Sequence, residues 1–182
     1  GILCFNIESA NELARLQAVA AEMGLRAPVS VRVNPDVDPK THPYIATGLT
    51  RNKFGIAFPQ ALEVYRQAKG MQNIQLVGID FHIGSQITDT QPYADAVERL
   101  AAMVETLSRE GIELSHLDLG GGLGIRYRDE QPITPLQYAA AVLPRLAKLP
   151  HKIILEPGRY LVGNAGVLLT RVEHLKRGAQ KH

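Results

Sequence analysis

The sequence contains no tryptophan, a single cysteine, and only 5% aromatic residues among its 182 positions. The one cysteine, Cys4, cannot form an internal disulfide, which favours a reducing compartment. The net charge of +2 is too small for a nucleic-acid-binding surface, and no apolar run approaches the roughly 20 residues that span a bilayer. We therefore expect a cytoplasmic protein with neither nucleic acid nor membrane as a partner.

Short apolar segments alternate with segments of helical periodicity along the chain. The segments predicted to form strands are 5–9, 29–33, 74–83, 117–119 and 153–155. Helices are predicted from the Ser9–Glu12 capping box to Gly24, from Pro59 to Gly70, over 97–107 before Gly111, and from the Thr134–Pro135 start to Lys148. Such alternation is typical of an α/β protein with a parallel sheet covered by helices.

The predicted sheet has about five strand-helix units, whereas eight units and about 250 residues close a TIM barrel. The pattern changes after Arg159, because residues 161–172 lack a helical period. These residues are predicted to be the opening strands of a separate β-domain.

Three polar clusters follow apolar, strand-like segments at nearly even spacing. They are His82-Ile83-Gly84-Ser85, Gly120-Gly121-Gly122 and Glu156-Pro157-Gly158-Arg159, with 38 residues from His82 to Gly120 and 36 from Gly120 to Glu156. This is the length of one strand-helix unit, and parallel strands place their carboxyl ends on one rim. We expect the clusters to converge there as a site for an anionic aromatic cofactor.

Each cluster has chemistry that suits such a cofactor and an ordinary structural alternative. Glu156 could keep a pyridine nitrogen protonated while Arg159 holds a phosphate or carboxylate, or the two could form a structural salt bridge. The glycines could bring the backbone close to an anion, or could form only a turn. His82 could stack on a flat ring, with Ser85 donating to a phosphate, or it could be a core histidine.

Two other kinds of site are considered. Asp80 with His82, and His116 with Asp118, resemble metal-ligand pairs on neighbouring strands. However, His116 precedes Gly120 by four residues, roughly 13 Å at about 3.3 Å per residue, and should lie near the opposite rim. No metal site is therefore predicted. Lys53 lies in a polar loop and is expected to anchor that loop rather than act as a catalytic amine.

Several motifs occur together along the chain and in the order of a known family. They are Phe5-Asn6-Ile7-Glu8-Ser9, Arg32-Val33-Asn34-Pro35-Asp36, Thr41-His42-Pro43-Tyr44, Lys53-Phe54-Gly55-Ile56, His82-Ile83-Gly84-Ser85-Gln86, Leu117-Asp118-Leu119-Gly120-Gly121-Gly122-Leu123-Gly124, and Glu156-Pro157-Gly158-Arg159 with Asn164-Ala165-Gly166. With these motifs the chain resembles the fold-type III pyridoxal-phosphate decarboxylases. The loop from Asn34 to Tyr44 and Gln86 favour the diaminopimelate branch over the ornithine and arginine decarboxylases.

The resemblance implies that pyridoxal 5'-phosphate is the cofactor and that the full-length protein converts meso-2,6-diaminopimelate to L-lysine and CO2. It implies that His82 stacks on the cofactor ring and that Glu156 pairs with the pyridine nitrogen. It further implies that Arg159 contacts a substrate carboxylate. The residues implied to hold the cofactor are His82, Ser85, Gly120, Gly121, Gly122, Glu156, Pro157, Gly158 and Arg159. The family also implies a homodimer and a small amino-acid substrate.

The chain departs from the family in what it lacks. The family's Schiff-base lysine belongs to an early barrel strand upstream of Gly1, so no catalytic residue is assigned within this chain. We expect an internal fragment that is inactive alone, with residues 1–160 as about strands four to eight of a partial TIM (β/α)8 barrel and residues 161–182 as the start of the C-terminal β-domain. The alternatives are an ornithine- or arginine-type decarboxylase, a non-catalytic relative like the antizyme inhibitors, and a metal-dependent barrel hydrolase.

Overall fold

The structure, a computed structural model, describes residues 1–38 and 54–176. The strands are β1 (Phe5–Ile7), β2 (Ala27–Asn34), β3 (Ile56–Ala57), β4 (Ile74–Asp80), β5 (His116–Asp118) and β6 (Lys152–Ile154). The helices are α1 (Ala10–Glu22), α2 (Phe58–Lys69), α3 (Gln91–Arg109), α4 (Pro135–Leu146) and α5 (Gly158–Val162). None of the helices within these ranges has the length and apolar character needed to traverse a bilayer.

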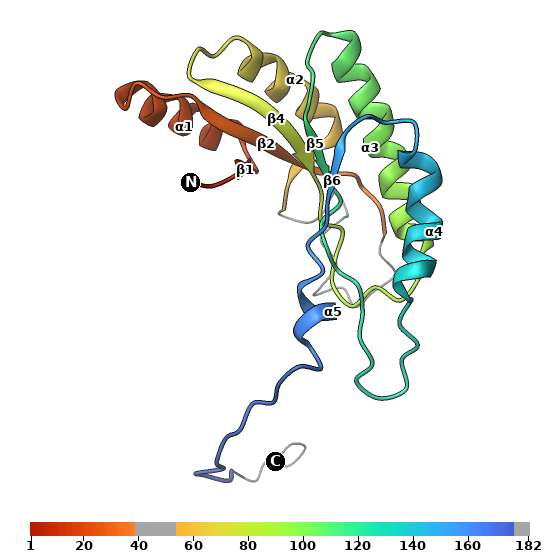
Figure 1. Cartoon of the computed structure of the whole chain (residues 1–182). Coiled ribbons are helices and arrows are strands. Elements are labelled where there is room, and N and C mark those ends of the chain that lie inside the picture. The colour runs from red at the N-terminus through yellow and green to blue at the C-terminus, as the bar shows by residue number, and fades with distance from the viewer. Residues whose placement is uncertain (39–53, 177–182) are drawn as a thin grey trace.

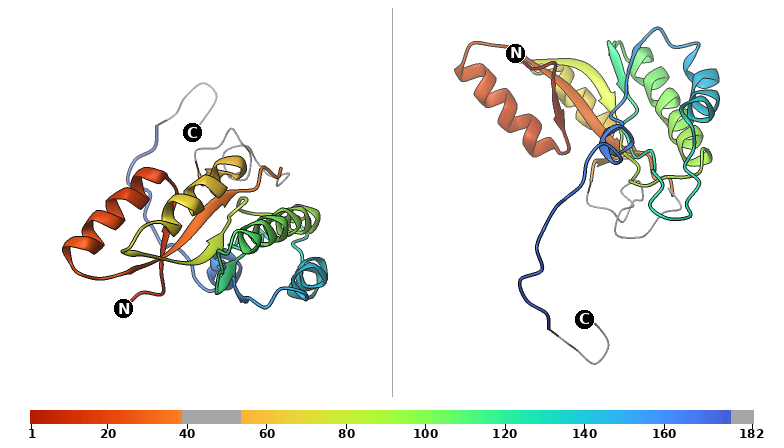
Figure 2. Two further views of the ribbon diagram at one scale, coloured as in Figure 1. Left: turned by 90° about the horizontal axis from the view of Figure 1, so that it is seen from above. Right: turned by 60° about the horizontal axis from the view of Figure 1, so that its bottom comes forward.

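The strands form one parallel sheet in the order β1-β2-β4-β5-β6, and the short β3 pairs with the end of β2. Each longer connection therefore moves one step in the same direction along the sheet. Because strand-helix-strand crossovers are almost always right-handed, this order places the connecting helices on one side. Figures 1 and 2 show α2, α3 and α4 arranged along the same side of the sheet. The predicted α/β class with a parallel sheet is confirmed, while closure into a barrel stays a prediction.

Local signals explain where the helices begin and end. Ser9 caps α1, since its Oγ accepts a hydrogen bond from the Glu12 amide at 3.2 Å, and Gly24 with a φ of 64° follows the helix. The Glu12 carboxylate accepts from the Glu8 amide at 2.6 Å, so only half of the predicted capping box forms. At α4 both halves form, between Thr134 and Gln137.

Alternation along the strands separates an apolar face from a polar face. The apolar residues Val29, Val31, Ile79 and Leu117 are fully buried in the core shared with the helices. The neighbouring positions in the same strands carry the buried polar residues Ser30, Asp80, His116 and Asp118. Successive side chains in a strand point to opposite faces, so these polar groups share the face that the helices do not cover.

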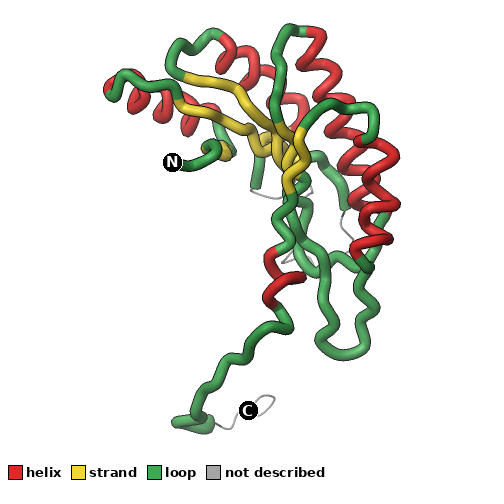
Figure 3. Tube along the Cα trace, viewed as in Figure 1, coloured by secondary structure: helices red, strands yellow, loops and turns green. Residues whose placement is uncertain are grey.

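Three predicted strand segments end earlier than expected or are not formed. The strand predicted over 5–9 ends at Ile7, because Ser9 caps α1. The strand predicted over 74–83 ends at Asp80, because the chain then turns toward the glycine segment that follows β5. The prediction of strands over 161–172 is wrong: Leu161 and Val162 lie in α5, and residues 163–176 adopt no regular structure. Figure 3 shows this last segment as a loop leading away from the sheet. Val167, Leu168 and Leu169 are more than nine-tenths exposed there, so no packing stabilises a strand.

Candidate functional site

The polar face of the sheet is built in rows by the strand register. Asp80 on β4 pairs with Arg32 on β2 and with Asp118 on β5, so these three residues form one row across the sheet. His82 and Gly120 lie two residues further along, beyond the strand ends, and Glu156 occupies the matching position after β6. The three predicted clusters therefore meet at the carboxyl ends of neighbouring strands, above a charged row.

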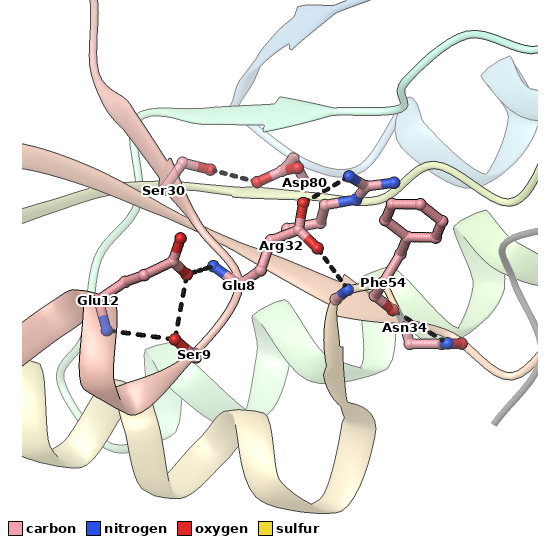
Figure 4. A network of polar contacts seen from close by, with 9 residues as sticks. Glu8, Ser9, Glu12, Ser30, Arg32, Asn34, Phe54 and Asp80 are labelled. Carbon is pink, nitrogen blue, oxygen red and sulfur yellow. Dashed lines mark hydrogen bonds and ion pairs between the residues drawn. The ribbon is translucent and has the colours of Figure 1, made fainter. Parts of the chain in front are cut away.

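Two members of the charged row have polar partners just after β1 and on β2: Arg32 pairs with Glu8, and Asp80 with Ser30 (Figure 4). Nη1 of Arg32 lies 2.7 Å from Oε1 of Glu8, and the other Glu8 oxygen accepts a hydrogen bond from the Gly55 amide at 2.8 Å. The Arg32 guanidinium also lies 5.3 Å from the centroid of the Phe54 ring. Glu8 thus links the end of β1 to β2 and to the segment before β3.

Asp80 and Asp118 form a buried acid pair in this row. Burial raises the pKa of Asp80 to about 7, and the Ser30 hydroxyl, which donates to Oδ1 of Asp80 at 3.1 Å, partly opposes this. Burial also raises the pKa of Asp118, although its Oδ1 accepts the Gly120 amide at 2.9 Å. The negative charge of Glu156 raises the pKa of both carboxyls further. The row beneath the site therefore favours holding a proton on Asp80 near neutral pH.

His82 is fixed as a neutral imidazole. Its Nδ1 accepts a hydrogen bond from the Gly121 amide at 3.3 Å, which leaves the ring proton on Nε2. Burial lowers the pKa of His82, and the positive charge of Arg32 lowers it further. A neutral, flat ring at this point can pack against an aromatic ligand without adding charge to the site.

The three glycines after β5 are required by the neighbouring backbone. A side-chain carbon at Gly120 would overlap the Phe81 carbonyl, one at Gly121 the Glu156 carbonyl, and one at Gly122 the Gly84 carbonyl. Gly120 and Gly122 also have φ values of 63° and 95°, in the left-handed region that favours glycine. The backbone of the three glycines thus packs closely against the loops that follow β4 and β6. This packing brings the three clusters together.

Glu156 and Arg159 do not form the salt bridge that the structural alternative required. The Glu156 amide donates to the Gly120 carbonyl at 2.8 Å, while its carboxylate is exposed and pairs with no side chain in the described part of the chain. Nη1 of Arg159 instead donates to Oε1 of Gln86 at 3.5 Å, and its Cζ lies 5.9 Å from the centroid of the Tyr127 ring. A carboxylate and a guanidinium thus remain available at the site.

The other predicted positions lie around this centre. Ser85 is half-buried in the loop after β4, next to Gly84, which touches the glycine segment. Pro157 precedes α5, and Gly158 begins it in open space with its amide donating to the Glu156 carbonyl at 2.8 Å. Lys53 and the Thr41–Tyr44 motif fall outside the described residues.

The pairs considered as metal ligands have other partners. His116 lies beside Gly78 in the register, two rows below Gly120, and a side chain at residue 78 would overlap its ring. Its Nε2 lies 3.8 Å from Sγ of Cys4, which is only partly buried. Among residues 1–38 and 54–176, no group of three or more acidic, histidine or cysteine side chains is placed to hold a metal ion.

Sequence reasoning assigned no site role to three residues that the structure brings to the centre. Arg32 and Gln86 stand out in the sequence only as parts of family motifs, and Asp118 only in such a motif and in the rejected metal-ligand pair. In the structure the charge of Arg32 acts on His82, Asp118 accepts the Gly120 amide, and Gln86 contacts Arg159. Asp118 precedes Gly120 by two positions, as Asp80 precedes His82, so strand alternation could have placed it on the site face. No comparable pattern marks Gln86, which lies in a loop.

Comparison with known proteins defines the class. Residues 1–163 match the family model for the pyridoxal-binding domain of pyridoxal-dependent decarboxylases, and the chain belongs to that family. The resemblance inferred from the motifs is thereby confirmed.

The relatives are more specific. The diaminopimelate decarboxylases of Pseudomonas aeruginosa and Neisseria meningitidis are 56% and 57% identical over 181 and 182 residues, which is 100% of this chain and 44% or 45% of theirs. The chain thus spans less than half the length of these relatives. The crystal structure of Helicobacter pylori diaminopimelate decarboxylase complexed with L-lysine matches with a TM-score of 0.84 and 42% identity, over 87% of this chain and 40% of that one. The Vibrio vulnificus lysine/ornithine decarboxylase complexed with putrescine matches with a TM-score of 0.71 and 29% identity, over 88% and 39%.

Proposed function

We propose that this chain is part of a pyridoxal-phosphate-dependent diaminopimelate decarboxylase, which converts meso-2,6-diaminopimelate to L-lysine and CO2. The observation that carries the proposal is the meeting of a neutral His82, the glycine turn and an uncompensated Glu156–Arg159 pair at adjacent strand ends. Identity above 50% to several diaminopimelate decarboxylases over the whole chain supports the choice of substrate.

The side chains present suit pyridoxal phosphate. A pyridine ring with a phosphate arm needs an acid at its nitrogen, a flat group against its face, and donors for the phosphate. Glu156 is a carboxylate without a side-chain partner in the described ranges. His82 is a neutral ring in the same row, on the far side of the glycine turn that follows β5. Ser85, the backbone of the glycine turn and the backbone around Gly158 and Arg159 are the proposed phosphate-binding groups. Pro157, which has no amide hydrogen to donate, is proposed to shape the turn between Glu156 and Gly158 at the cofactor site.

The bound cofactor would supply an electron sink for the bond between the substrate carbon and the departing CO2. Three side chains of this chain would bind and orient the cofactor and the substrate for that role. Glu156 keeps a proton on the pyridine nitrogen, because an adjacent carboxylate favours the charged ring. His82 would cover one ring face. Because it is neutral, it adds no second positive charge that would compete with the pyridine nitrogen for the Glu156 carboxylate. Arg159 binds a substrate carboxylate by its guanidinium fork.

We also propose that the sheet is about half of a TIM (β/α)8 barrel formed by residues 1–160. Residues 161–182 are proposed to lead into a C-terminal β-domain, of which no strand is formed within 161–176. The strand order follows the chain and the helices share one side, as in a singly wound barrel. The polar face would then line the barrel interior. The amine that anchors the cofactor is expected on a strand outside this chain, so the 182 residues are proposed to be inactive alone.

The substrate class is a small amino acid, and a homodimer in the cytoplasm is the proposed setting for the full-length protein. Helicobacter pylori diaminopimelate decarboxylase was crystallised with L-lysine, a product-like amino acid, which supports this class. An ornithine- or arginine-type specificity and a non-catalytic relative are the competing functions.

The decisive experiment measures CO2 release by the full-length protein with pyridoxal phosphate and, separately, meso-diaminopimelate, ornithine or arginine. We expect release with diaminopimelate only, accompanied by formation of L-lysine. Release with ornithine or arginine instead would overturn the substrate assignment. A protein without bound-cofactor absorbance and without activity on any of the three would overturn the enzyme assignment.

A further inference from the structure

Gln86 joins three segments of the site that are far apart in the sequence. Its side-chain amide makes two hydrogen bonds with the backbone of Ile125: Oε1 accepts the Ile125 amide at 3.1 Å, and Nε2 donates to the Ile125 carbonyl at 2.5 Å. Next to it, the Ile87 amide donates to the Gly122 carbonyl at 2.9 Å. The loop after β4 is thus fastened along the segment that follows the glycine turn.

The backbone of Gln86 is held in an unusual conformation. Its φ of 57° lies in the left-handed region, where residues other than glycine are uncommon. Strained residues of this kind persist only where their surroundings hold them, and they gather at functional sites. Here the two hydrogen bonds from the Gln86 side chain to the Ile125 backbone provide the restraint. Both the backbone and the side-chain amide of Gln86 are therefore held in place.

The third contact of Gln86 is with Arg159. Nη1 of Arg159 approaches Oε1 of Gln86 at 3.5 Å, and the guanidinium lies over the Tyr127 ring at 5.9 Å. Within residues 1–38 and 54–176 no acidic side chain forms an ion pair with Arg159. The guanidinium is therefore oriented by a neutral amide and an aromatic face.

A neutral acceptor and a carboxylate would have different consequences for Arg159. A carboxylate at residue 86 would pair with the guanidinium and compensate its charge. An amide oxygen orients the same group and leaves its charge and remaining donors for an anion. The residue at position 86 thereby decides whether Arg159 can take a carboxylate.

We propose that Gln86 is a positioning residue for substrate capture: it holds the Arg159 guanidinium in place through a neutral contact and leaves its charge for the substrate carboxylate. The proposal rests on the decarboxylase function proposed above. It adds that affinity for the substrate depends on the amide of Gln86 through its contact with Arg159.

The test uses the full-length protein loaded with pyridoxal phosphate and compares Gln86→Glu, Gln86→Met and the matched control Gln75→Glu. Gln75 is exposed at the opposite end of β4, so its change makes the same chemical substitution away from the site. For Gln86→Glu we expect KM to rise about tenfold or more, with kcat within about threefold and cofactor retention unchanged. Gln86→Met, which keeps the length and adds no charge, should raise KM by less, and Gln75→Glu should leave KM unchanged.

A double-mutant cycle separates positioning from a general structural role. In an Arg159→Gln background, Gln86→Glu should change kcat/KM by less than about twofold, because the group it acts through is already gone. The same large loss of kcat/KM in both backgrounds would overturn the proposal. An unchanged KM in Gln86→Glu, or a fall in kcat and cofactor retention as large as the change in KM, would also overturn it. If instead the unsubstituted protein neither retains the cofactor nor decarboxylates diaminopimelate, the proposed function fails before Gln86 is in question.

Discussion

The main-chain amide of Gly121 donates a hydrogen bond to Nδ1 of His82, over 3.3 Å. This bond joins the loop after β4 to the glycine turn after β5 and at the same time fixes which imidazole nitrogen carries the proton. The Gly121 backbone also lies against the Glu156 carbonyl, so the same residue meets the third cluster. Packing at one glycine therefore determines both the assembly of the site and the charge state of its histidine.

Replacing Gly121 with alanine should disrupt the site. The added carbon would overlap the Glu156 carbonyl, so β5 and β6 would have to separate beyond their strand ends. We expect the full-length Gly121→Ala variant to lose most of its bound cofactor and to be destabilised by about 1–3 kcal/mol. Absorbance of the bound cofactor and thermal unfolding measure the two effects.

Gly70→Ala is the matched control, because Gly70 ends α2 with a φ of −80° and has room for a side-chain carbon. Full cofactor binding in both variants would show that the close packing at Gly121 is not needed.

Replacing Glu156 with glutamine should impair catalysis more than cofactor binding. The amide keeps the size of the side chain but cannot stabilise a positive pyridine nitrogen. We expect kcat of the full-length protein to fall about a hundredfold or more, while the bound cofactor is retained. The exposed Glu22→Gln variant at the end of α1 serves as control. An unchanged kcat would contradict the role assigned to Glu156.

Replacing Arg159 with glutamine should weaken substrate capture far more than cofactor retention. The guanidinium is held by Gln86 and Tyr127 without an ion-pair partner in the described residues, so its charge is available for a carboxylate. We expect KM for diaminopimelate to rise by about ten- to a hundredfold, and Arg109→Gln, an exposed change on α3, to have no effect. Equal loss of substrate and cofactor affinity would instead indicate that Arg159 contacts mainly the phosphate.

Replacing Asp80 with asparagine should stabilise the protein at higher pH. The pKa of Asp80 is raised from 3.8 to about 7 on folding, so the folded state takes up a proton between these values. The free energy of unfolding then falls as the pH rises from about 4 to about 7. Above pH 7 the full cost of keeping a charged, buried Asp80 is present. Asparagine does not titrate, and the charged groups around it (Arg32, Asp118 and Glu156) are unchanged.

We therefore expect the thermal midpoint of Asp80→Asn to exceed that of the unsubstituted full-length protein at pH 8, with the difference shrinking toward pH 5. Its upper limit is on the order of 4 kcal/mol, at about 1.4 kcal/mol per pKa unit. Asp95→Asn, on the exposed side of α3, should show no such trend. A midpoint difference that is constant across this range would contradict a raised Asp80 pKa.

Much of the fold follows from local sequence signals. Ser9, Gly24, Thr134 and Pro135 mark helix ends that the structure places within one or two residues of the prediction. Even spacing of the clusters at His82, Gly120 and Glu156 also predicted their convergence. These features depend on short-range periodicity and on the rule that parallel strands end on one rim.

Contacts between neighbouring segments could not be predicted in the same way. The glycines were expected to accommodate a ligand, whereas their nearest neighbours are the carbonyls of Phe81, Gly84 and Glu156. The role of Gln86 depends on a side-chain contact across 73 residues, for which the sequence carries no periodic signal. The segment 161–172 has the apolar composition of a strand but no partner to pair with in the described structure, and a strand requires a partner to form.

The central claim is that the ends of β4, β5 and β6 surround one cofactor molecule. A crystal structure of the full-length protein with pyridoxal phosphate tests this most directly. The account predicts the His82 ring against one face of the pyridine, the Glu156 carboxylate within hydrogen-bond distance of the pyridine nitrogen, and the phosphate at the glycine turn. A cofactor bound elsewhere, or with its nitrogen turned away from Glu156, would contradict it.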